Sequence, residues 1–157
     1  MSAFAFTPLA YFITWTVYAT HLQGDDRGWR KRGKGNCEPQ PKLVAWHEER
    51  LKHETFLFEE QQRALVKEEI VRVCHFKEWK LWAVNVRTNH VHVVVTTATH
   101  SDQFVRDSLK ANATRYLREH FPVFHDRKVW TKGGDIEWID TEENLQEVID
   151  YVLNRQD

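Results

Sequence analysis

The stretch Trp79-Lys-Leu-Trp-Ala-Val-Asn-Val-Arg-Thr-Asn-His-Val-His-Val-Val-Val-Thr-Thr97 decides the fold of this chain. Residues 79–87 and 90–97 are rich in β-branched and aromatic residues, and the polar pair Thr88-Asn89 separates them. Two such runs joined by two turn-forming residues predict an antiparallel β-hairpin. We therefore expect a sheet in which the strand around residues 90–97 is central.

Helical patterns lie on both sides of this hairpin. Residues 59–77 carry an apolar stripe with Glu and Lys elsewhere, which predicts an amphipathic helix. The stripe consists of Val66, Ile70, Val73 and Cys74. A second helix is predicted to begin at an N-cap, Ser101 or Asp102, and to run to about Glu119. Its apolar side consists of Val105, Leu109, Ala113, Tyr116 and Leu117.

The two ends of the chain complete the pattern. Alternation in Tyr11-Phe-Ile-Thr-Trp-Thr-Val-Tyr18 predicts a strand over about 10–19. Val129-Trp-Thr131 and Ile136-Glu-Trp-Ile139 flank Lys132-Gly-Gly-Asp135, which predicts a second hairpin. Thr141 is the expected N-cap of a last helix that runs to the end of the chain, with Glu142 and Glu143 suited to its dipole. This order of elements predicts an α+β sandwich of the ferredoxin-like type with a central antiparallel sheet.

Size and composition bound the class of protein. A chain of 157 residues predicts a single domain over 1–157. No apolar run approaches the length of a membrane span and residues 1–12 do not resemble a signal peptide, so we expect a cytoplasmic protein. Cys37 and Cys74 lack the spacing of a zinc knuckle and are expected to be ordinary thiols. The formal net charge of -1 requires any DNA site to be a local patch.

A long basic loop is predicted at about 21–45. Glycines and prolines there predict no regular element. The tract Trp29-Arg-Lys-Arg-Gly-Lys-Gly35 can lie on a phosphate backbone or be a solvated charge run, and composition favours neither.

His90 and His92 are the candidate metal ligands. Alternate residues of a strand point to one face, so the two imidazoles stand side by side while Val91, Val93 and Val95 face the other way. An arbitrary H-x-H is more often only a strand surface. Here the valines bury the opposite face, so two adjacent polar rings call for a metal or a phosphate.

Three chemistries use two histidines around an apolar residue. The histidine-triad hydrolases need a third histidine, where this chain has Val94. The two-histidine phosphoesterases need a second, distant histidine motif, which is not found in a strand context. The HUH endonuclease arrangement needs two histidines on a strand, a divalent cation and a tyrosine on a helix, and this one fits.

The chain resembles the insertion-sequence-200-like transposases and the related REP-associated tyrosine transposases of the HUH superfamily. The resemblance is carried by Ala83-Val-Asn-Val-Arg-Thr-Asn-His-Val-His-Val-Val-Val95, by the first strand and by Asp150-Tyr-Val-Leu-Asn-Arg-Gln156, and spans nearly the whole chain. It implies a homodimer that nicks single-stranded DNA, often beside a hairpin, through a 5′-phosphotyrosine intermediate. It also implies a Mg²⁺ or Mn²⁺ cofactor.

Tyr151 is the expected nucleophile among four tyrosines. Tyr116 falls on an apolar stripe, and Tyr11 and Tyr18 open and close the first strand. The stripe of the last helix consists of Leu145, Val148, Ile149 and Val152, and Tyr151 lies off its centre. The alternative is a boundary tyrosine that covers a helix end.

The third metal ligand is where the sequence departs from the family. The family's usual Gln or Asn four residues after the tyrosine is Arg155 here. Gln156 is named first because of the motif, although it requires a distorted last turn, with Asn154 as substitute and Arg155 as a phosphate clamp. The alternative is a frayed terminus.

DNA binding is expected from a local basic set, which consists of Arg30, Lys31, Arg32, Lys34, Arg106, Lys110, Arg115 and Arg155. The alternative function is a domesticated protein that binds hairpin DNA without cutting it.

Overall fold

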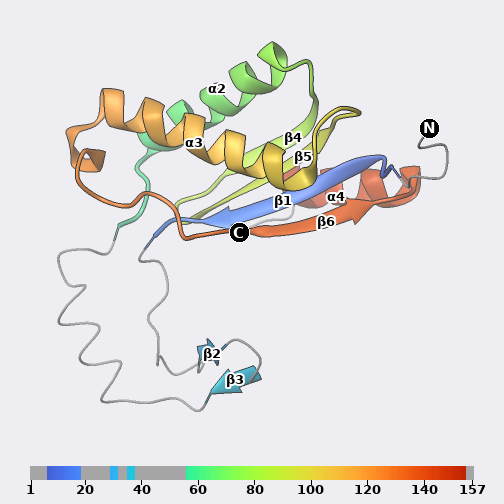
Figure 1. Cartoon of the computed structure of the whole chain (residues 1–157), viewed down its shortest axis with the longest axis horizontal. Helices are drawn as coiled ribbons and strands as arrows, with labels where there is room; N and C mark the ends of the chain where they lie inside the picture. The colour runs from blue at the N-terminus through green and yellow to red at the C-terminus, as the bar shows by residue number, and fades with distance from the viewer. Residues whose placement is uncertain (1–6, 19–28, 32–34, 38–55, 155–157) are drawn as a thin grey trace.

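A computed structural model defines residues 7–18, 29–31, 35–37 and 56–154 (Figure 1). Its centre is a four-stranded antiparallel sheet in the order β4-β5-β1-β6. The strands are β1 (Ala10–Thr16), β4 (Lys80–Val86), β5 (His90–Thr96) and β6 (Asp135–Ile139). The helices are α2 (Glu60–Phe76), α3 (Asp102–His120), α4 (Glu142–Asn154) and the short 3-10 helix η1 (Pro122–Phe124). The predicted α+β sandwich with a central antiparallel sheet is confirmed.

The two faces of the sheet have different covers (Figure 1). The face with α2 and α3 carries the larger core, in which Ile13, Trp15, Val91 and Val93 pack among the helices. The other face carries a smaller cluster under α4, built on Ala10, Ala83, Val94, Ile139, Leu145 and Val152. Because successive residues of a strand face opposite ways, β1 and β5 each serve both clusters.

The helix boundaries follow the caps expected from the sequence. The Ser101 hydroxyl accepts a hydrogen bond from the Phe104 N–H at 3.1 Å, so Ser101 is the N-cap of α3. The Thr141 hydroxyl accepts one from the Asn144 N–H at 3.1 Å at the start of α4. Both side chains satisfy donors that a helix leaves unpaired in its first turn.

The predicted hairpin over residues 129–139 is wrong. Thr14 pairs with Asp135, and Val17 forms an isolated bridge with Trp130, so both arms pair with β1 instead of with each other. Five residue steps separate Trp130 from Asp135 but three separate Val17 from Thr14, so two residues are extra. The Gly133-Gly134 pair accommodates them as a bulge, with φ of +80° and +140°. Sequence spacing could not distinguish this bulge from a hairpin turn.

Two further expectations are corrected. The segment 21–45 holds a short antiparallel pair, β2 (Trp29–Lys31) and β3 (Gly35–Cys37), where no regular element was expected. A ladder of three residue pairs is too short to show in the sequence pattern. Tyr116 is only half-buried and packs on His120 with ring centroids 4.6 Å apart, because the buried stripe of α3 is Val105, Leu109, Ala113 and Leu117.

The buried thiol agrees with its expected role, since burial raises the pKa of Cys74 to about 12. Within the described part of the chain, no helix is long and apolar enough to cross a membrane.

Candidate metal and nucleophile site

His90 and His92 stand side by side on the face of β5 that α4 covers. Their ring centroids are 4.6 Å apart, and the ring planes are nearly perpendicular at 88°. Val91, Val93 and Val95 are fully buried on the opposite face. The alternation predicted from the sequence is therefore confirmed.

Two side chains of β1 hold the His92 ring in place. Its Nδ1 forms a hydrogen bond of 2.9 Å with the Thr14 hydroxyl, and the Phe12 ring stacks on it at 5.6 Å. Burial, followed by the charges of His90 and Arg87, lowers the pKa of His92 to about 4. The ring is therefore neutral at neutral pH and keeps a lone pair for a cation.

The pair fits a divalent metal in its donor chemistry. Nδ1 of His90 is hydrogen-bonded to the Asn89 side-chain oxygen, as Nδ1 of His92 is to Thr14. Nδ1 of each ring is therefore engaged in a hydrogen bond that orients the ring, and Nε2 is the nitrogen that could bind a metal. Imidazole suits Zn, Cu, Fe and Ni, whereas Mg²⁺ and Mn²⁺ prefer oxygen ligands. A Mg²⁺ or Mn²⁺ ion at this pair would therefore need oxygen atoms to complete its ligand set.

Tyr151 approaches the same place from α4. Its ring centroid lies 6.1 Å from that of His92 and 6.3 Å from that of Phe12, both in edge-on geometry. The residue is 44% exposed, whereas Leu145 and Val152 of the same helix are buried. The structure thus brings the expected nucleophile to the histidine pair and leaves it accessible to a substrate.

Asn85 ties this helix to the sheet, and sequence reasoning missed it. Asn85 pairs with His92 across β4 and β5, and its side-chain amide donates to the Val152 carbonyl at 2.8 Å. The contact anchors the residue next to Tyr151. Thr14 was missed as well. Both polar residues are in phase with the histidine face of their strands, which is the signal that the sequence offered.

The other tyrosines lie elsewhere. Tyr116 belongs to α3, which covers the opposite face of the sheet. Tyr11 is buried on that opposite face too, where burial and then the Asp102 charge raise its pKa. Tyr18, 39% exposed, follows β1, and Lys128 lies over its ring at 5.2 Å. None of the three is brought to the histidine pair.

A match to a protein-family model shows the family of this chain. The family model described as transposase IS200 like matches residues 49–155. The chain belongs to the IS200-like transposase family. The family indicates a role in transposase-like DNA processing. No curated protein matches the sequence.

Solved structures agree with this IS200-like fold. One is a REP-associated tyrosine transposase bound to a REP hairpin, with a TM-score of 0.53 and 12% identity over 94% of this chain. This chain spans 66% of that protein's length. Another is a putative transposase from Deinococcus radiodurans, with a TM-score of 0.51 and 16% identity over 96% of this chain and 93% of that one. At these identities the likeness shows the fold alone.

The described residues include one of the expected further metal ligands, Asn154. Within them, no group of three or more His, Cys, Asp or Glu residues could hold a metal ion. Asn154, the substitute ligand, donates from its side-chain amide to the Asp150 carboxylate at 3.0 Å. Gln156 and Arg155 lie outside the described residues.

The expected DNA-binding cations of α3 do not form one face. Arg106 donates to the Gly134 carbonyl at 3.2 Å, and Lys110 donates to the carbonyls of Thr131 and Gly133, so both face the glycine bulge. Arg115 lies on the side toward α2, 3.8 Å from the Glu69 carboxylate. The structure therefore brings Arg106 and Lys110 together but not Arg115.

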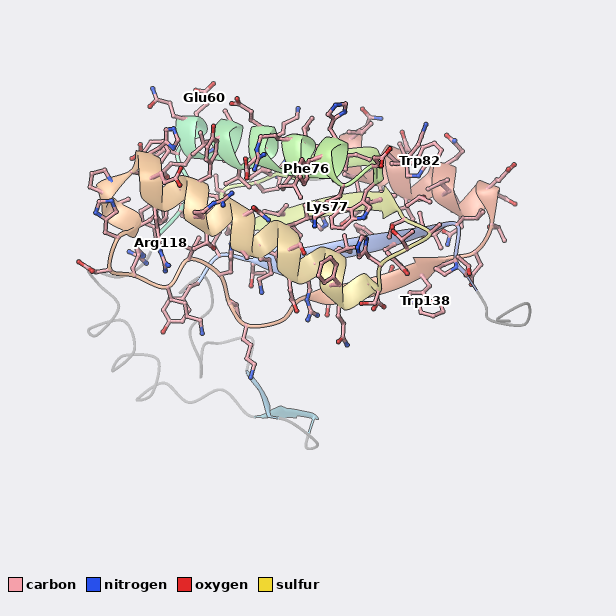
Figure 2. The ribbon with its side chains drawn as sticks, turned by 45° about the horizontal axis from the view of Figure 1, so that its top comes forward. Glu60, Phe76, Lys77, Trp82, Arg118 and Trp138 are labelled. Atoms are coloured by element: carbon pink, nitrogen blue, oxygen red, sulfur yellow. The ribbon has the colours of Figure 1, made fainter. Side chains whose placement is uncertain are left out.

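A cation-lined pocket of about 410 Å³ lies beside α3. Besides Lys110, its lysines and arginine are Arg118, Lys128 and Lys132, which sequence reasoning missed. Figure 2 shows Arg118 on α3, where it donates to the carbonyls of Phe124 and Arg127. Of the basic loop, Arg30 and Lys31 are described only as backbone of β2, and Arg32 and Lys34 lie outside the described residues.

Proposed function

We propose that the protein nicks single-stranded DNA and transfers the cut strand through a 5′-phosphotyrosine intermediate. The nucleophile is Tyr151, and His90 and His92 are ligands of Mg²⁺ or Mn²⁺. The observation that carries the proposal is that Tyr151 and His92 lie on one face of the sheet with their ring centroids 6.1 Å apart. A nucleophile and a pair of metal-ligating side chains held on rigid elements are what a phosphoryl transfer requires.

The chain's own residues divide the work. When bound, the metal neutralises charge on the scissile phosphate. The Tyr151 oxygen attacks the phosphorus and loses its proton to water, while the bond from phosphorus to the 3′-oxygen breaks and that oxygen takes up a proton. Attack by another 3′-hydroxyl on the phosphotyrosine reverses the step and joins the strands. Thr14 and Asn89 orient the imidazoles throughout.

The remaining ligand and contacts belong to the same proposal. Gln156, with Asn154 as substitute, completes the metal site. Of the basic set named from the sequence, all members but Arg115, which lies toward α2, contact the DNA backbone. The substrate is single-stranded or hairpin DNA, and the working form is a homodimer, which sedimentation of the purified protein tests.

Covalent capture tests the chemistry. A 3′-labelled pool of randomised single-stranded oligonucleotides is incubated with protein and Mn²⁺, then run on a denaturing gel, because a 5′-phosphotyrosine leaves the 3′ part of the strand on the protein. The wild type should form a labelled adduct that chelator prevents. Tyr151→Phe removes only a hydroxyl, so it should lose the adduct and keep DNA binding.

Tyr116→Phe is the matched control and should keep the adduct. An adduct formed by Tyr151→Phe, or a DNA-linked peptide that contains Tyr116, would overturn the assignment. Reversible binding with no adduct in the wild type would instead identify a non-cleaving, hairpin-binding protein.

A further inference from the structure

A pocket of about 230 Å³ opens beside the histidine pair, between β1 and the glycine bulge. The hydroxyl residues Thr14 and Thr16 line it, and each is the β1 partner of one histidine, His92 and His90 respectively. Neighbouring strands are about 5 Å apart. The pocket is therefore one strand away from the place where the scissile phosphate would lie.

The bulge side of this pocket offers hydrogen-bond donors. Lys132, Gly133 and Gly134 line it, and their peptide N–H groups form no hydrogen bond within the described part of the chain. The carbonyls of the bulge are bound on the other side by Lys110 and Arg106. Because a peptide N–H points opposite to the carbonyl of the residue before it, the Lys132 and Gly134 N–H groups point away from α3 and can meet a ligand.

The sheet side offers an acceptor. Asp135 lines the pocket and pairs with Thr14 on the histidine face, so its carboxylate completes a row across the sheet: Asn85, His92, Thr14 and Asp135. A carboxylate repels a phosphate, so an anion is disfavoured here. A neutral group with both donors and acceptors satisfies this lining better.

We propose that this pocket binds one unstacked guanine of the DNA strand that crosses the histidine pair, with Asp135 as the specificity-determining residue. Among the DNA bases, guanine places two N–H donors, N1 and N2, side by side to meet a carboxylate, and its O6 accepts from the bulge N–H groups or Lys132. Single-stranded DNA is read by such base edges once a base is unstacked. The inference rests on the proposed function insofar as the ligand is single-stranded DNA.

Selection followed by single-atom changes tests it. Tyr151→Phe protein in chelator, which binds without cutting, is used to select from a randomised single-stranded library, and one guanine position should dominate the bound pool. Replacing that guanine by inosine, which lacks the N2 amino group, should weaken binding about tenfold. Asp135→Asn should remove this discrimination. Glu137→Gln, on the same face of β6 but outside the pocket lining, should retain it.

The outcomes separate this inference from the chemistry. Equal guanine and inosine binding by the wild-type pocket, or unchanged discrimination in Asp135→Asn, overturns it while the covalent adduct still stands. Tighter binding of every sequence by Asp135→Asn would mean that the pocket holds a phosphate, which also overturns it. Asp135-dependent discrimination without an adduct in the capture assay would support the pocket and refute the nuclease. No binding to single strands would refute both.

Discussion

Replacing Gly134 by alanine should destabilise the protein more than the same change at Gly133. Gly134 has a φ of +140°, and a Cβ there would stand 2.8 Å from the Thr14 carbonyl oxygen and 3.1 Å from the Trp15 Cβ. Gly133 has a φ of +80°, and a Cβ there would meet nothing within 4 Å. Both positions strain an L residue, but only Gly134 also lacks room.

The expected magnitudes follow from these two differences. Strain alone at Gly133 should lower the free energy of unfolding by about 1–2 kcal/mol. At Gly134 the same strain is joined by overpacking of about 1–3 kcal/mol, for a total of about 2–5 kcal/mol, because the obstructing atom is backbone of the central strand β1 and cannot swing away. The whole free energy of unfolding of a single domain is about 5–15 kcal/mol, so this loss is a large part of it.

Urea unfolding followed by tryptophan fluorescence measures the difference. The Trp15 and Trp130 rings lie beside the bulge with their centroids 5.8 Å apart, so their fluorescence reports on this region. At equal m-values, the midpoint of Gly134→Ala should fall well below that of Gly133→Ala. Equal midpoints for the two variants would refute the packing argument, and would mean that the backbone of β1 shifts to make room for a methyl group.

The remaining predictions concern the metal and the DNA backbone. His90→Ala combined with His92→Ala should abolish Mn²⁺ binding in calorimetry and metal-dependent cleavage, with the fold kept by the untouched valine face; cleavage equal to wild type in Mn²⁺ and in chelator would refute the metal assignment. Neutralising the loop quartet should lower the salt slope of single-strand binding by about 0.7 per lost contact, and an unchanged slope would show a solvated insertion. The quartet consists of Arg30, Lys31, Arg32 and Lys34.

Local sequence patterns sufficed for the elements whose partners are close in the chain. The hairpin of β4 and β5 follows from two β-rich runs around Thr88-Asn89, and the starts of α3 and α4 follow from Ser101 and Thr141. The prediction of a hairpin around the glycine bulge failed because the true partner of both arms, β1, is more than a hundred residues away. Pattern alone carries no information on which strand such arms will join.

The site was predictable to the same extent. The shared face of His90 and His92 follows from strand alternation, and the accessible position of Tyr151 follows from helical periodicity. The hydrogen bond of Thr14 to His92 joins residues 78 apart, and that of Asn85 to Val152 joins residues 67 apart. Such contacts depend on strand order, which the sequence did not reveal.

Strand order also explains why the sheet, and not a loop, sets the geometry of the proposed chemistry. His92 is flanked in register by Thr14 on β1 and by Asn85 on β4. The first flank fixes the imidazole through its Nδ1, and the second fixes α4 through the carbonyl of Val152, next to Tyr151. Ligand and nucleophile are thus positioned from the two neighbours of one central strand. A shift of either neighbour would move one of the two groups relative to the other, and a displacement of about 1 Å is enough to cost a large factor in rate.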